Sequence, residues 1–272
     1  MTITLVTGAS SGFGATTAAT FAARGIHVVG TSRSGRATGG IEMVALDVDS
    51  DGSVERCIAD LEHRYGGIDI LVNNAGRAML GAAEETSAAE ARALFETNVF
   101  GVMRVTNAVL PGMRARGRGA IVNVGSVSGF IGVPFHGAYA ATKHALAGYT
   151  EALHLEVEAF GIRVALVEPA AHATGIDMAR PAALMPHYTL ARERVGALIR
   201  GQIEAGGDPQ RVADAIVRCA TSPRSAWRVR VGGKAILGNF ARRLLTIRMF
   251  ERFLRREFER TSPALRPGPD PS

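Results

Sequence analysis

The sequence predicts a single-domain α/β protein with a doubly wound parallel sheet of six or seven strands and helices on both faces. The chain begins with a strand, a glycine-rich loop, a helix and a second strand. Short apolar runs then alternate with helix-favouring stretches, and no internal repeat or linker interrupts them. A length of 272 residues with 47 % hydrophobic content is enough for one large domain with its own core.

The composition argues against several classes of protein. No apolar run reaches the ~18 residues of a transmembrane helix, and the first residues enter a strand pattern too early for a signal peptide. Cys57 and Cys219 are the only cysteines, and the seven histidines lack the spacing of metal ligands. We therefore expect a cytoplasmic protein without a disulfide framework or a metal site. The preference for Arg and Ala over Lys favours a bacterial source with a GC-rich genome.

The net charge of +6 comes from the C-terminal segment. Residues 226–272 contain eleven Lys or Arg and four Asp or Glu, whereas residues 1–225 contain twenty and twenty-one, a net charge of −1. A nearly neutral body lacks the positive surface that nucleic-acid-binding domains use. We therefore expect no nucleic-acid partner.

The first strand, helix and second strand are expected at residues 3–6, about 15–24 and 26–31. The glycines of the intervening loop allow a tight turn, and the start of the helix offers free N–H groups to a pyrophosphate. An ordinary tight turn could have the same composition, but its position between a strand and a helix favours nucleotide binding. The residues expected to hold the pyrophosphate are Gly8, Ser10, Ser11, Gly12, Phe13 and Gly14.

The end of the second strand predicts the choice of cofactor. An acidic residue at this place holds the ribose 2′-hydroxyl of NAD(H), and a basic residue accommodates the 2′-phosphate of NADP(H). The sequence has no acid here, and Arg33 stands between Ser32 and Ser34. Arg33 is either a solvated loop residue or a phosphate ligand. We expect NADP(H) to be preferred over NAD(H).

The third strand (43–46) and the fourth strand (68–72) each lead into polar or small residues. Asp47, followed by Val48, either accepts a hydrogen bond from the adenine amino group or caps the next turn. A helix begins at Ser50 or Ser53 and ends near residue 65. The residues after the fourth strand form either a ligand crevice or a plain turn. They are Asn73, Asn74, Ala75 and Gly76.

A long helix is expected from a capping box at Ser87 and Glu90 to about residue 116. Asn98 lies near its middle, where asparagine is unfavourable, so a functional reason is expected. The fifth strand (119–124) ends just before Ser126, which places this serine at the edge of the sheet where ligands bind.

Tyr139 and Lys143 lie four residues apart in an Ala-rich stretch that favours a helix to about residue 160. This spacing places both side chains on one helix face, about 6 Å apart along the axis. A neighbouring ammonium lowers the pKa of a phenol, which makes the pair a candidate proton donor and acceptor. Alone, the pair would fit an amphipathic helix. Because Lys143 is one of only two lysines in a chain that otherwise uses arginine for positive charge, the choice of lysine at this position is unusual.

The remaining elements complete the sheet. A sixth strand (162–167) stops at Glu168 and Pro169, and residues 170–186 show no clean period. The prolines and apolar side chains of this segment favour either a lid over an apolar pocket or a surface loop with a small core. Two helices and a last strand are expected at 189–205, 209–221 and 227–231.

The C-terminal segment has a different character. A helix from about residue 240 to 260 combines large apolar side chains with seven arginines. Such a helix either packs on the body or a second subunit, which we favour, or makes weak contact with an anionic membrane surface. We expect a nucleotide-binding and catalytic domain at 1–238, this helix within 239–261 and a disordered tail at 262–272.

With these motifs in order, the sequence resembles the short-chain dehydrogenase/reductase family over residues 1 to about 235. The resemblance rests on the glycine loop, the two residues after the third strand, the Asn-Asn-Ala-Gly run and the four residues Asn98, Ser126, Tyr139 and Lys143. Residues 151–169 are similar to the branch with the 17β-hydroxysteroid and retinol dehydrogenases. The resemblance implies a Rossmann-type fold and a homodimer or homotetramer formed through the helices around 87–116 and 138–160.

The resemblance also implies roles for the four residues. Tyr139 would be the general acid and base, and Lys143 would bind the nicotinamide ribose and lower the pKa of Tyr139. Ser126 would orient the substrate carbonyl, and Asn98 would hold a water in a proton relay. Pro169 and Thr174 match family residues next to the nicotinamide. Ala170 departs from the family glycine, which puts a backbone contact to the carboxamide in doubt, since alanine tolerates a positive φ poorly.

We thus expect an NADP(H)-dependent oxidoreductase that interconverts a lipophilic ketone and a secondary alcohol. Two alternatives are a family member catalysing a non-redox or internal redox reaction, such as epimerisation or dehydration, and a non-catalytic nucleotide-sensing protein. The expected pocket is mostly apolar, with His136 as a wall or polar anchor, which we favour, or as a second base. Besides Ser126, its residues are Val127, Phe130, Val133, Phe135, His136, Met178 and Met185.

Overall fold

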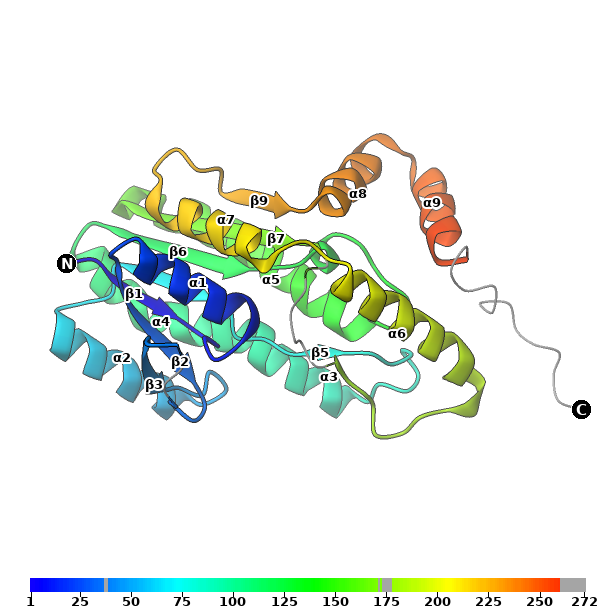
Figure 1. Ribbon diagram of the computed structural model, residues 1–272, viewed down its shortest axis with the longest axis horizontal. Helices are drawn as coiled ribbons and strands as arrows, with labels where there is room; N and C mark the ends of the chain where they lie inside the picture. The colour runs from blue at the N-terminus through cyan, green and yellow to red at the C-terminus, as the bar shows by residue number, and fades with distance from the viewer. Residues whose placement is uncertain (37–38, 171, 173–177, 260–272) are drawn as a thin grey trace, which may run out of the picture.

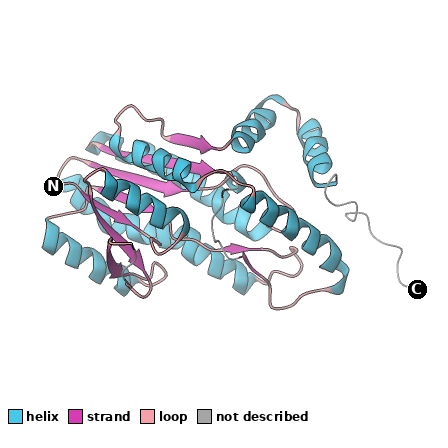
Figure 2. Cartoon of the chain, in the orientation of Figure 1, coloured by secondary structure: helices cyan, strands magenta, loops and turns pink. Residues whose placement is uncertain are grey.

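A parallel sheet of seven strands forms the centre of the described structure, a computed structural model that covers residues 1–36, 39–170, 172 and 178–259 (Figures 1 and 2). The strands follow the order β3-β2-β1-β4-β6-β7-β9. Their bounds are β1 (Ile3–Val6), β2 (His27–Ser32), β3 (Glu42–Ala45), β4 (Ile70–Asn73), β6 (Gly119–Val124), β7 (Ile162–Pro169) and β9 (Arg228–Val231). Because the order reverses between β1 and β4, their carboxyl ends meet at a crevice.

Helices cover both faces of this sheet, as the sequence predicts. On one face, α1 and α7 pack against each other and on the apolar side chains of β1, β4, β6 and β7 (Figure 1). On the other face, α2, α4 and α5 enclose a second core. The long helices are α1 (Gly12–Ala23), α2 (Asp51–Tyr65), α4 (Gly101–Ala115), α5 (Gly137–Val157), α6 (Thr189–Glu204) and α7 (Pro209–Thr221).

The helix expected at 87–116 has a wide turn in its middle. It consists of α3 (Ala88–Phe95), a π-helical turn η1 (Glu96–Phe100) and α4. The capping box of Ser87 and Glu90 is confirmed, since each side chain bonds the backbone N–H of the other residue. π-Turns of this kind usually occur at functional sites, and Asn98 lies inside this one.

Several other boundaries differ from the sequence prediction. β7 continues through Glu168 and Pro169, and α1 begins at Gly12, within the glycine loop. A small parallel pair, β5 (Ala78–Met79) and β8 (Met178–Ala179), was not predicted at all. Short 3-10 turns complete the described elements: η2 (Val127–Gly129), η3 (Glu158–Phe160) and η4 (Pro186–Tyr188).

Ion pairs stabilise the carboxyl end of β7. The carboxylate of Glu168 is fully buried and accepts two hydrogen bonds from Arg228, and Arg230 forms a second ion pair with it. A buried carboxylate needs such partners, because desolvation without them is costly. This pairing fixes the backbone from which Pro169 and Ala170 extend.

The C-terminal segment forms two helices rather than the single helix expected. α8 (Gly233–Leu244) contains the boundary predicted at residue 238, and α9 (Ile247–Glu259) follows it (Figure 1). Ala235 is fully buried and Gly238 approaches the side chain of Ile131, so α8 packs on the body. The opposite face exposes Ile236, Leu237, Phe240 and Leu244 at 58–66 %.

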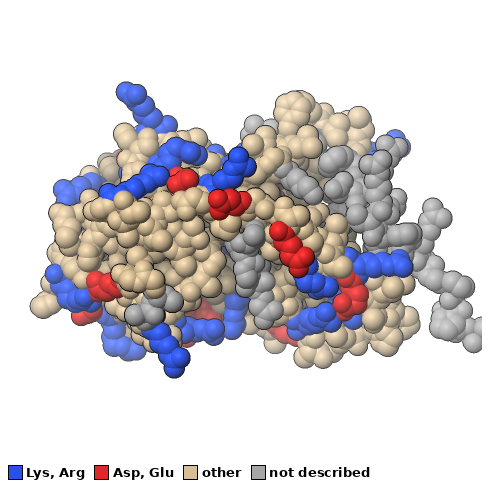
Figure 3. Space-filling model, viewed as in Figure 1, with Lys and Arg blue, Asp and Glu red and all other residues tan. Residues whose placement is uncertain are grey.

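Three further observations concern the described residues as a whole. On the face in Figure 3, acidic side chains lie among basic ones, in keeping with the nearly neutral body. None of the helices in the described residues combines the length and apolar character that crossing a bilayer requires. Within the same residues, no group of three His, Cys, Asp or Glu is arranged to hold a metal ion. The predicted tail at 262–272 lies outside the described residues.

Candidate active site

A cleft of about 730 Å³ runs along the carboxyl ends of the central strands, from the glycine loop to α5. It contains most residues that the sequence predicts for cofactor binding, together with the Tyr and Lys of α5. The predicted residues that line it are Gly8, Ser10, Ser11, Gly12, Phe13, Ser32, Arg33, Asp47, Val48, Asn74, Ala75, Gly76, Tyr139 and Lys143. The topology therefore brings motifs from the whole first half of the chain to one place.

The glycine loop after β1 needs its glycines because neighbouring backbone is very close. Gly8 has a φ of +65°, and a Cβ there would lie 2.9 Å from the Cα of Ala75. A Cβ on Gly14 would lie 2.2 Å from the Gly8 carbonyl oxygen. The side chain of Asn74 ties the loop to β4, since its Nδ2 donates to the carbonyls of Thr7 and Gly8 at 3.0 Å. Asn74 thus shapes the loop.

The start of α1 fits a pyrophosphate. Ser11 is the N-cap residue, but its side chain accepts no hydrogen bond from the helix. The first N–H groups of a helix have no partner within it, and the positive end of the helix dipole lies at the same place. With Ser10 and Phe13 also lining the cleft, the residues present fit a dinucleotide phosphate at this end.

The adenosine end of the cleft follows β2 and β3. Arg33 is exposed and lines the cleft between Ser32 and Ser34, whose hydroxyls lie 3.4 Å apart. Asp47 caps the next turn, because its Oδ1 accepts from the N–H of Asp49 at 3.1 Å. Its side chain also faces the cleft, so both alternatives considered for this residue remain compatible with the geometry.

Lys143 lies one turn after Tyr139 on α5, and its ammonium is buried against the end of β6. Nζ donates to the carbonyl of Val124 at 3.0 Å and lies 5.8 Å from the centre of the Tyr139 ring. Burial disfavours the charged amine and lowers the pKa of Lys143 to about 8. The carbonyl at the end of β6 therefore fixes the position of the Lys143 ammonium, and burial at that place lowers its pKa.

The pKa of Tyr139 differs from the expectation. We expected Lys143 to lower it, but burial raises the pKa of Tyr139 above its ordinary value, and the hydrogen bond with the Ser126 hydroxyl only opposes this shift. The Lys143 ammonium is directed to Val124 instead of the phenol. In this arrangement the phenol is protonated at neutral pH and suited to donate a proton.

Ser126 follows β6 directly and lies beside Tyr139. Its side chain accepts a hydrogen bond from the N–H of Ser128 at 3.1 Å, which fixes the start of the turn η2. A hydroxyl held this way, next to a phenol, can orient a substrate carbonyl oxygen.

Asn98 is buried in the π-turn η1 and makes three hydrogen bonds. Its Oδ1 accepts from the N–H of Arg77, and its Nδ2 donates to the Arg77 carbonyl and to the hydroxyl of Thr142. Thr142 in turn donates to the carbonyl of Tyr139 at 2.7 Å. Asn98 therefore connects the loop after β4 with α5, and its part in a water-mediated relay stays a prediction.

The predicted substrate residues lie around the far end of the cleft, but among the described residues its lining includes none of them. Val127 and Phe130 follow Ser126, and Phe130 is 7 % exposed beneath the Arg230 guanidinium. Phe135 has a φ of +60°, and its ring lies 6.2 Å from that of Tyr188. Val133, Met178 and Met185 are partly exposed. Their contact with substrate stays a prediction.

His136 is the polar residue of this group. It is buried, packs edge-to-face on the Tyr139 ring at 5.0 Å, and its Nε2 has no hydrogen-bond partner. Burial lowers the pKa of His136 to about 4, so the imidazole is neutral. A neutral ring with an unpaired nitrogen suits the predicted role of a polar anchor.

The backbone after β7 bears on the carboxamide contact that Ala170 put in doubt. The N–H of Ala170 donates to the carbonyl of Val231 at 2.8 Å, so it already has a partner within the protein. Ala170 also has no positive φ, since Phe135 is the non-glycine residue with that conformation in the described chain. The glycine-to-alanine departure therefore causes no strain here. Pro169 is buried at the end of β7, and Thr174 lies outside the described residues.

A family model described as short chain dehydrogenase matches residues 2–184 of the chain. This match covers the glycine loop and all four proposed catalytic residues. The chain belongs to the short-chain dehydrogenase family.

Individual relatives agree with this membership. A 3-ketodihydrosphingosine reductase of Bacteroides thetaiotaomicron is 37 % identical over 235 residues, which cover 85 % of this chain and 87 % of the relative. Human retinol dehydrogenase 8 is 41 % identical over 180 residues, 61 % of this chain and 57 % of the human one. The crystal structure of a short-chain dehydrogenase from Streptomyces avermitilis superposes with a TM-score of 0.80 at 37 % identity, covering 96 % and 98 % of the two chains.

Sequence reasoning missed two parts of this site. The backbone of Arg77 and the hydroxyl of Thr142 link Asn98 to Tyr139, yet neither carries a recognisable motif. Thr142 stands between the Tyr and the Lys of the pattern, so its position one turn from Tyr139 was a usable signal. The Arg77 contact arises from its backbone, and no residue type in the sequence would have predicted it.

Proposed function

We propose that the protein is an NADP(H)-dependent oxidoreductase that interconverts a lipophilic ketone and a secondary alcohol. The observation that carries this proposal is that Tyr139, which bonds Ser126, and Lys143 line one end of a cleft whose other end is the glycine loop. A protein that only sensed a nucleotide would need the glycine loop. It would not need a buried Lys143 next to Tyr139, or the hydrogen bond between Tyr139 and Ser126.

The bound cofactor supplies the hydride chemistry, and the protein supplies binding, orientation and proton transfer. The glycine loop and the start of α1 would hold the pyrophosphate. Lys143 would bind the nicotinamide ribose, and Asp47 and Val48 would line the adenine site.

Tyr139 would donate its proton to the substrate oxygen during reduction and accept it during oxidation. Ser126 would bond the same oxygen and stabilise its developing negative charge. Asn98 would keep the catalytic helix in place through Thr142. General acid catalysis of this kind contributes about 10²–10⁴-fold to the rate.

The preference for NADP(H) rests on Arg33. Arg33 is exposed just after β2, between two serines whose hydroxyls lie 3.4 Å apart, and the run 32–34 contains no acid. A guanidinium bonds phosphate oxygens strongly through charge-assisted hydrogen bonds. NADPH as the cofactor favours reduction as the direction of the reaction.

The substrate class rests on the relatives and on the pocket residues. The names of two relatives specify a ketosphingoid and a retinol as their substrates. The residues expected around Ser126 and His136 in this chain are mainly apolar, which suits a long hydrocarbon or ring system. We propose a lipophilic ketone or secondary alcohol of this kind.

The proposed oligomer and the proposed membrane contact rest on exposed side chains. Phe100, Leu155 and Phe160 are exposed large apolar side chains in or next to the long helices, which supports a homodimer or homotetramer formed there. The arginines of α9 beside the exposed face of α8 suit a weak contact with an anionic membrane surface. The setting proposed is the cytoplasm of a bacterium.

A panel of ketones and alcohols assayed with NADPH and NADP⁺ tests this function. We expect the nicotinamide absorbance to change with a lipophilic ketone, and Tyr139→Phe to lower kcat by about 10²–10⁴-fold with unchanged NADPH affinity. Full turnover by Tyr139→Phe would overturn the mechanism. Conversion of a substrate without net NADPH consumption would replace it with an internal redox or non-redox reaction.

A further inference from the structure

Three chain segments that are far apart in the sequence meet at the substrate end of the cleft: residues 78–85, 130–136 and 178–193. β5 pairs with β8 in parallel, which joins the first segment to the third. The N–H of Gly81 donates to the carbonyl of Phe135 at 2.8 Å, which joins the first to the second. The Phe135 and Tyr188 rings join the second to the third. None of these segments belongs to the main sheet, so these contacts determine their positions.

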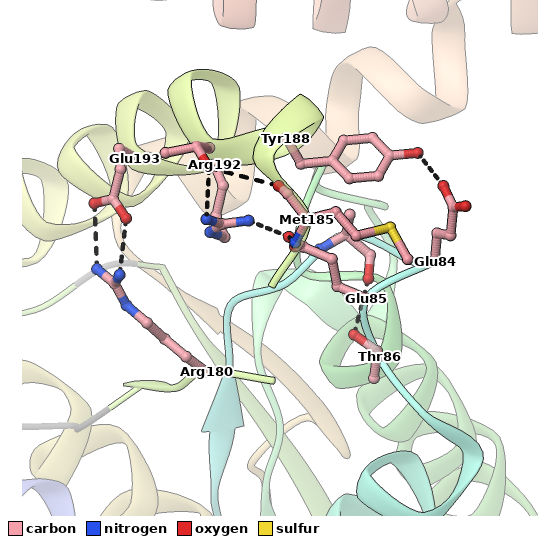
Figure 4. A network of polar contacts seen from close by, with 10 residues as sticks. Glu84, Glu85, Thr86, Arg180, Met185, Tyr188, Arg192 and Glu193 are labelled. Atoms are coloured by element: carbon pink, nitrogen blue, oxygen red, sulfur yellow. Dashed lines mark hydrogen bonds and ion pairs between the residues drawn. The ribbon is translucent and has the colours of Figure 1, made fainter. Parts of the chain in front are cut away.

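Glu85 joins the first of these segments to the third (Figure 4). Its Oε2 accepts from the N–H of Ala82 at 2.9 Å, and its Oε1 accepts from the N–H of Met185 at 2.8 Å and from Arg192. Glu85 and Arg192 are 0 % and 2 % exposed as side chains. One carboxylate therefore fixes its own loop, the Met185 backbone and the first turn of α6.

The charges explain why the contact between Glu85 and Arg192 is costly to break. Burial alone would raise the pKa of Glu85, but the two backbone N–H groups and the guanidinium lower it overall, so Glu85 is ionised. Breaking a buried ion pair leaves one charge without a partner in a low-dielectric place, which is strongly unfavourable. The two segments therefore separate far less readily than segments joined by surface contacts.

A second ion pair of the same chemistry lies close by on the surface. Arg180 donates two hydrogen bonds to Glu193, and the two side chains are 45 % and 41 % exposed (Figure 4). Water replaces such a contact with little loss. Arg180 thus offers a matched control, because it belongs to the same segment and differs from Arg192 mainly in burial.

We propose that Glu85 and Arg192 are positioning residues that hold the segment of Met185 against the substrate end of the cleft and so set the affinity for bulky ketones. The inference rests on the proposed function. Neither residue touches the reacting atoms. Their effect passes through the backbone of Met185, which Glu85 binds directly.

Steady-state kinetics with one bulky and one small ketone tests the proposal. We expect Glu85→Gln and Arg192→Met to raise KM for the bulky ketone roughly tenfold or more. In both variants, the kcat for the small ketone and the affinity for NADPH should stay within about twofold of the wild-type values. In Arg180→Met, kcat and KM for both ketones and the affinity for NADPH should all stay within that range. Arg192→Lys keeps the charge and should recover part of the bulky-ketone affinity.

Three results would overturn the proposal: an equal loss of kcat/KM for both ketones, an equally large effect of Arg180→Met, or unchanged kinetics in Glu85→Gln. If either single variant fails to fold, the double variant Glu85→Gln, Arg192→Met removes both charges and leaves neither unpaired. It should fold, and it should show the same loss of bulky-ketone affinity; equal wild-type and double-variant KM would count against the proposal.

Hydrogen exchange separates this inference from the proposed function, since it needs no substrate. Amides of residues 182–192 should exchange faster in Glu85→Gln than in the wild type, and at the wild-type rate in Arg180→Met. Faster exchange without activity on any ketone would leave the positioning role in place and overturn the proposed function. Equal exchange in all three proteins would overturn the positioning role.

Discussion

The end of the cleft proposed to bind the cofactor (the cofactor end) is made of short loops that directly follow parallel strands. The end proposed to bind the substrate (the substrate end) is made of long connections outside the main sheet. At the first end, backbone packs on backbone: Gly14 approaches the Gly8 carbonyl, and Asn74 bonds the same loop. At the second end, side chains such as Glu85 and Arg192 hold the segments. The cofactor end should therefore tolerate almost no added side-chain volume. The substrate end depends on a few charged or strained residues, so its sequence can vary with the substrate.

The strictest test of the cofactor end is Gly14→Ala. The added Cβ would lie 2.2 Å from the Gly8 carbonyl oxygen and 2.5 Å from the Asn74 Nδ2. Overpacking against backbone typically costs about 1–3 kcal/mol of stability. We expect the loop to shift to relieve it, which would lower NADPH affinity by up to roughly 100-fold. Fluorescence titration with NADPH measures this loss. Gly148→Ala on α5 is the control, because a Cβ added there would have no neighbouring atom within 4 Å.

At the substrate end, the stability of the fold should depend on pH through His136. Above pH 6.5 the imidazole is neutral in both the folded and the unfolded chain. Between pH 6.5 and about 4, His136 is protonated in the unfolded chain but stays neutral in the folded chain. The free energy of unfolding therefore falls as the pH falls through this window. The lowering of the pKa from 6.5 to about 4 corresponds to about 3 kcal/mol.

Urea unfolding at several pH values measures this effect. His136→Leu should remove the pH-dependent part, while His63→Leu, on the exposed surface of α2, should leave it unchanged. An identical slope in the wild type and His136→Leu between pH 6.5 and 4 would show that this histidine does not titrate as its burial requires.

Arg33→Ala tests whether the cofactor end discriminates by one side chain. We expect the ratio of NADPH to NADH affinity to fall roughly tenfold, since a charge-assisted contact to a phosphate contributes about 1.5–3 kcal/mol. Arg36→Ala, an exposed arginine three residues on, is the matched control. An unchanged ratio in Arg33→Ala would remove the basis for the NADP(H) preference.

The smallest effect for each residue replaced is expected outside both ends, at the C-terminal helices. Sedimentation with anionic vesicles should detect weak binding that falls on replacing Arg248 and Arg252 by Gln, by about 1 kcal/mol for each arginine. Arg56→Gln and Arg114→Gln on α2 and α4 remove the same charge from exposed positions of the body. No sedimentation of the wild type, together with a larger oligomer that Phe240→Glu disrupts, would assign the α8 face to a second subunit.

The same contrast explains what the sequence could predict. The seven strands of the sheet and most helices were predictable because buried strands need short apolar runs, and helix ends carry signals such as Ser87, Glu90 and Gly66. The cofactor end was predictable because each of its loops needs a particular residue type. Glycines 8 and 14, for example, have no room for a side chain.

The substrate end was not predictable in the same way. Glu85 and Arg192 are 107 positions apart, and nothing in the sequence around either residue indicates burial or pairing. The two-residue strands β5 and β8 are too short for a hydrophobic period and form only because the folded chain brings them together. The pKa of Tyr139 was predicted in the wrong direction, because spacing places Lys143 nearby but does not show that its ammonium bonds Val124.

The π-turn η1 has a consequence for how related chains can diverge. Leu94, before the turn, lines the cleft, while Val105, Val109 and Met113, after it, belong to the core beneath the sheet. An uninterrupted α-helix would place residues 94 and 105 on nearly the same side, because eleven residues make about three turns. The π-turn adds one residue to the helix, which rotates α4 relative to α3 by about 100° around the helix axis. A deletion of one residue here would therefore change the cleft and the core together, so insertions and deletions in this turn should be rarer than substitutions.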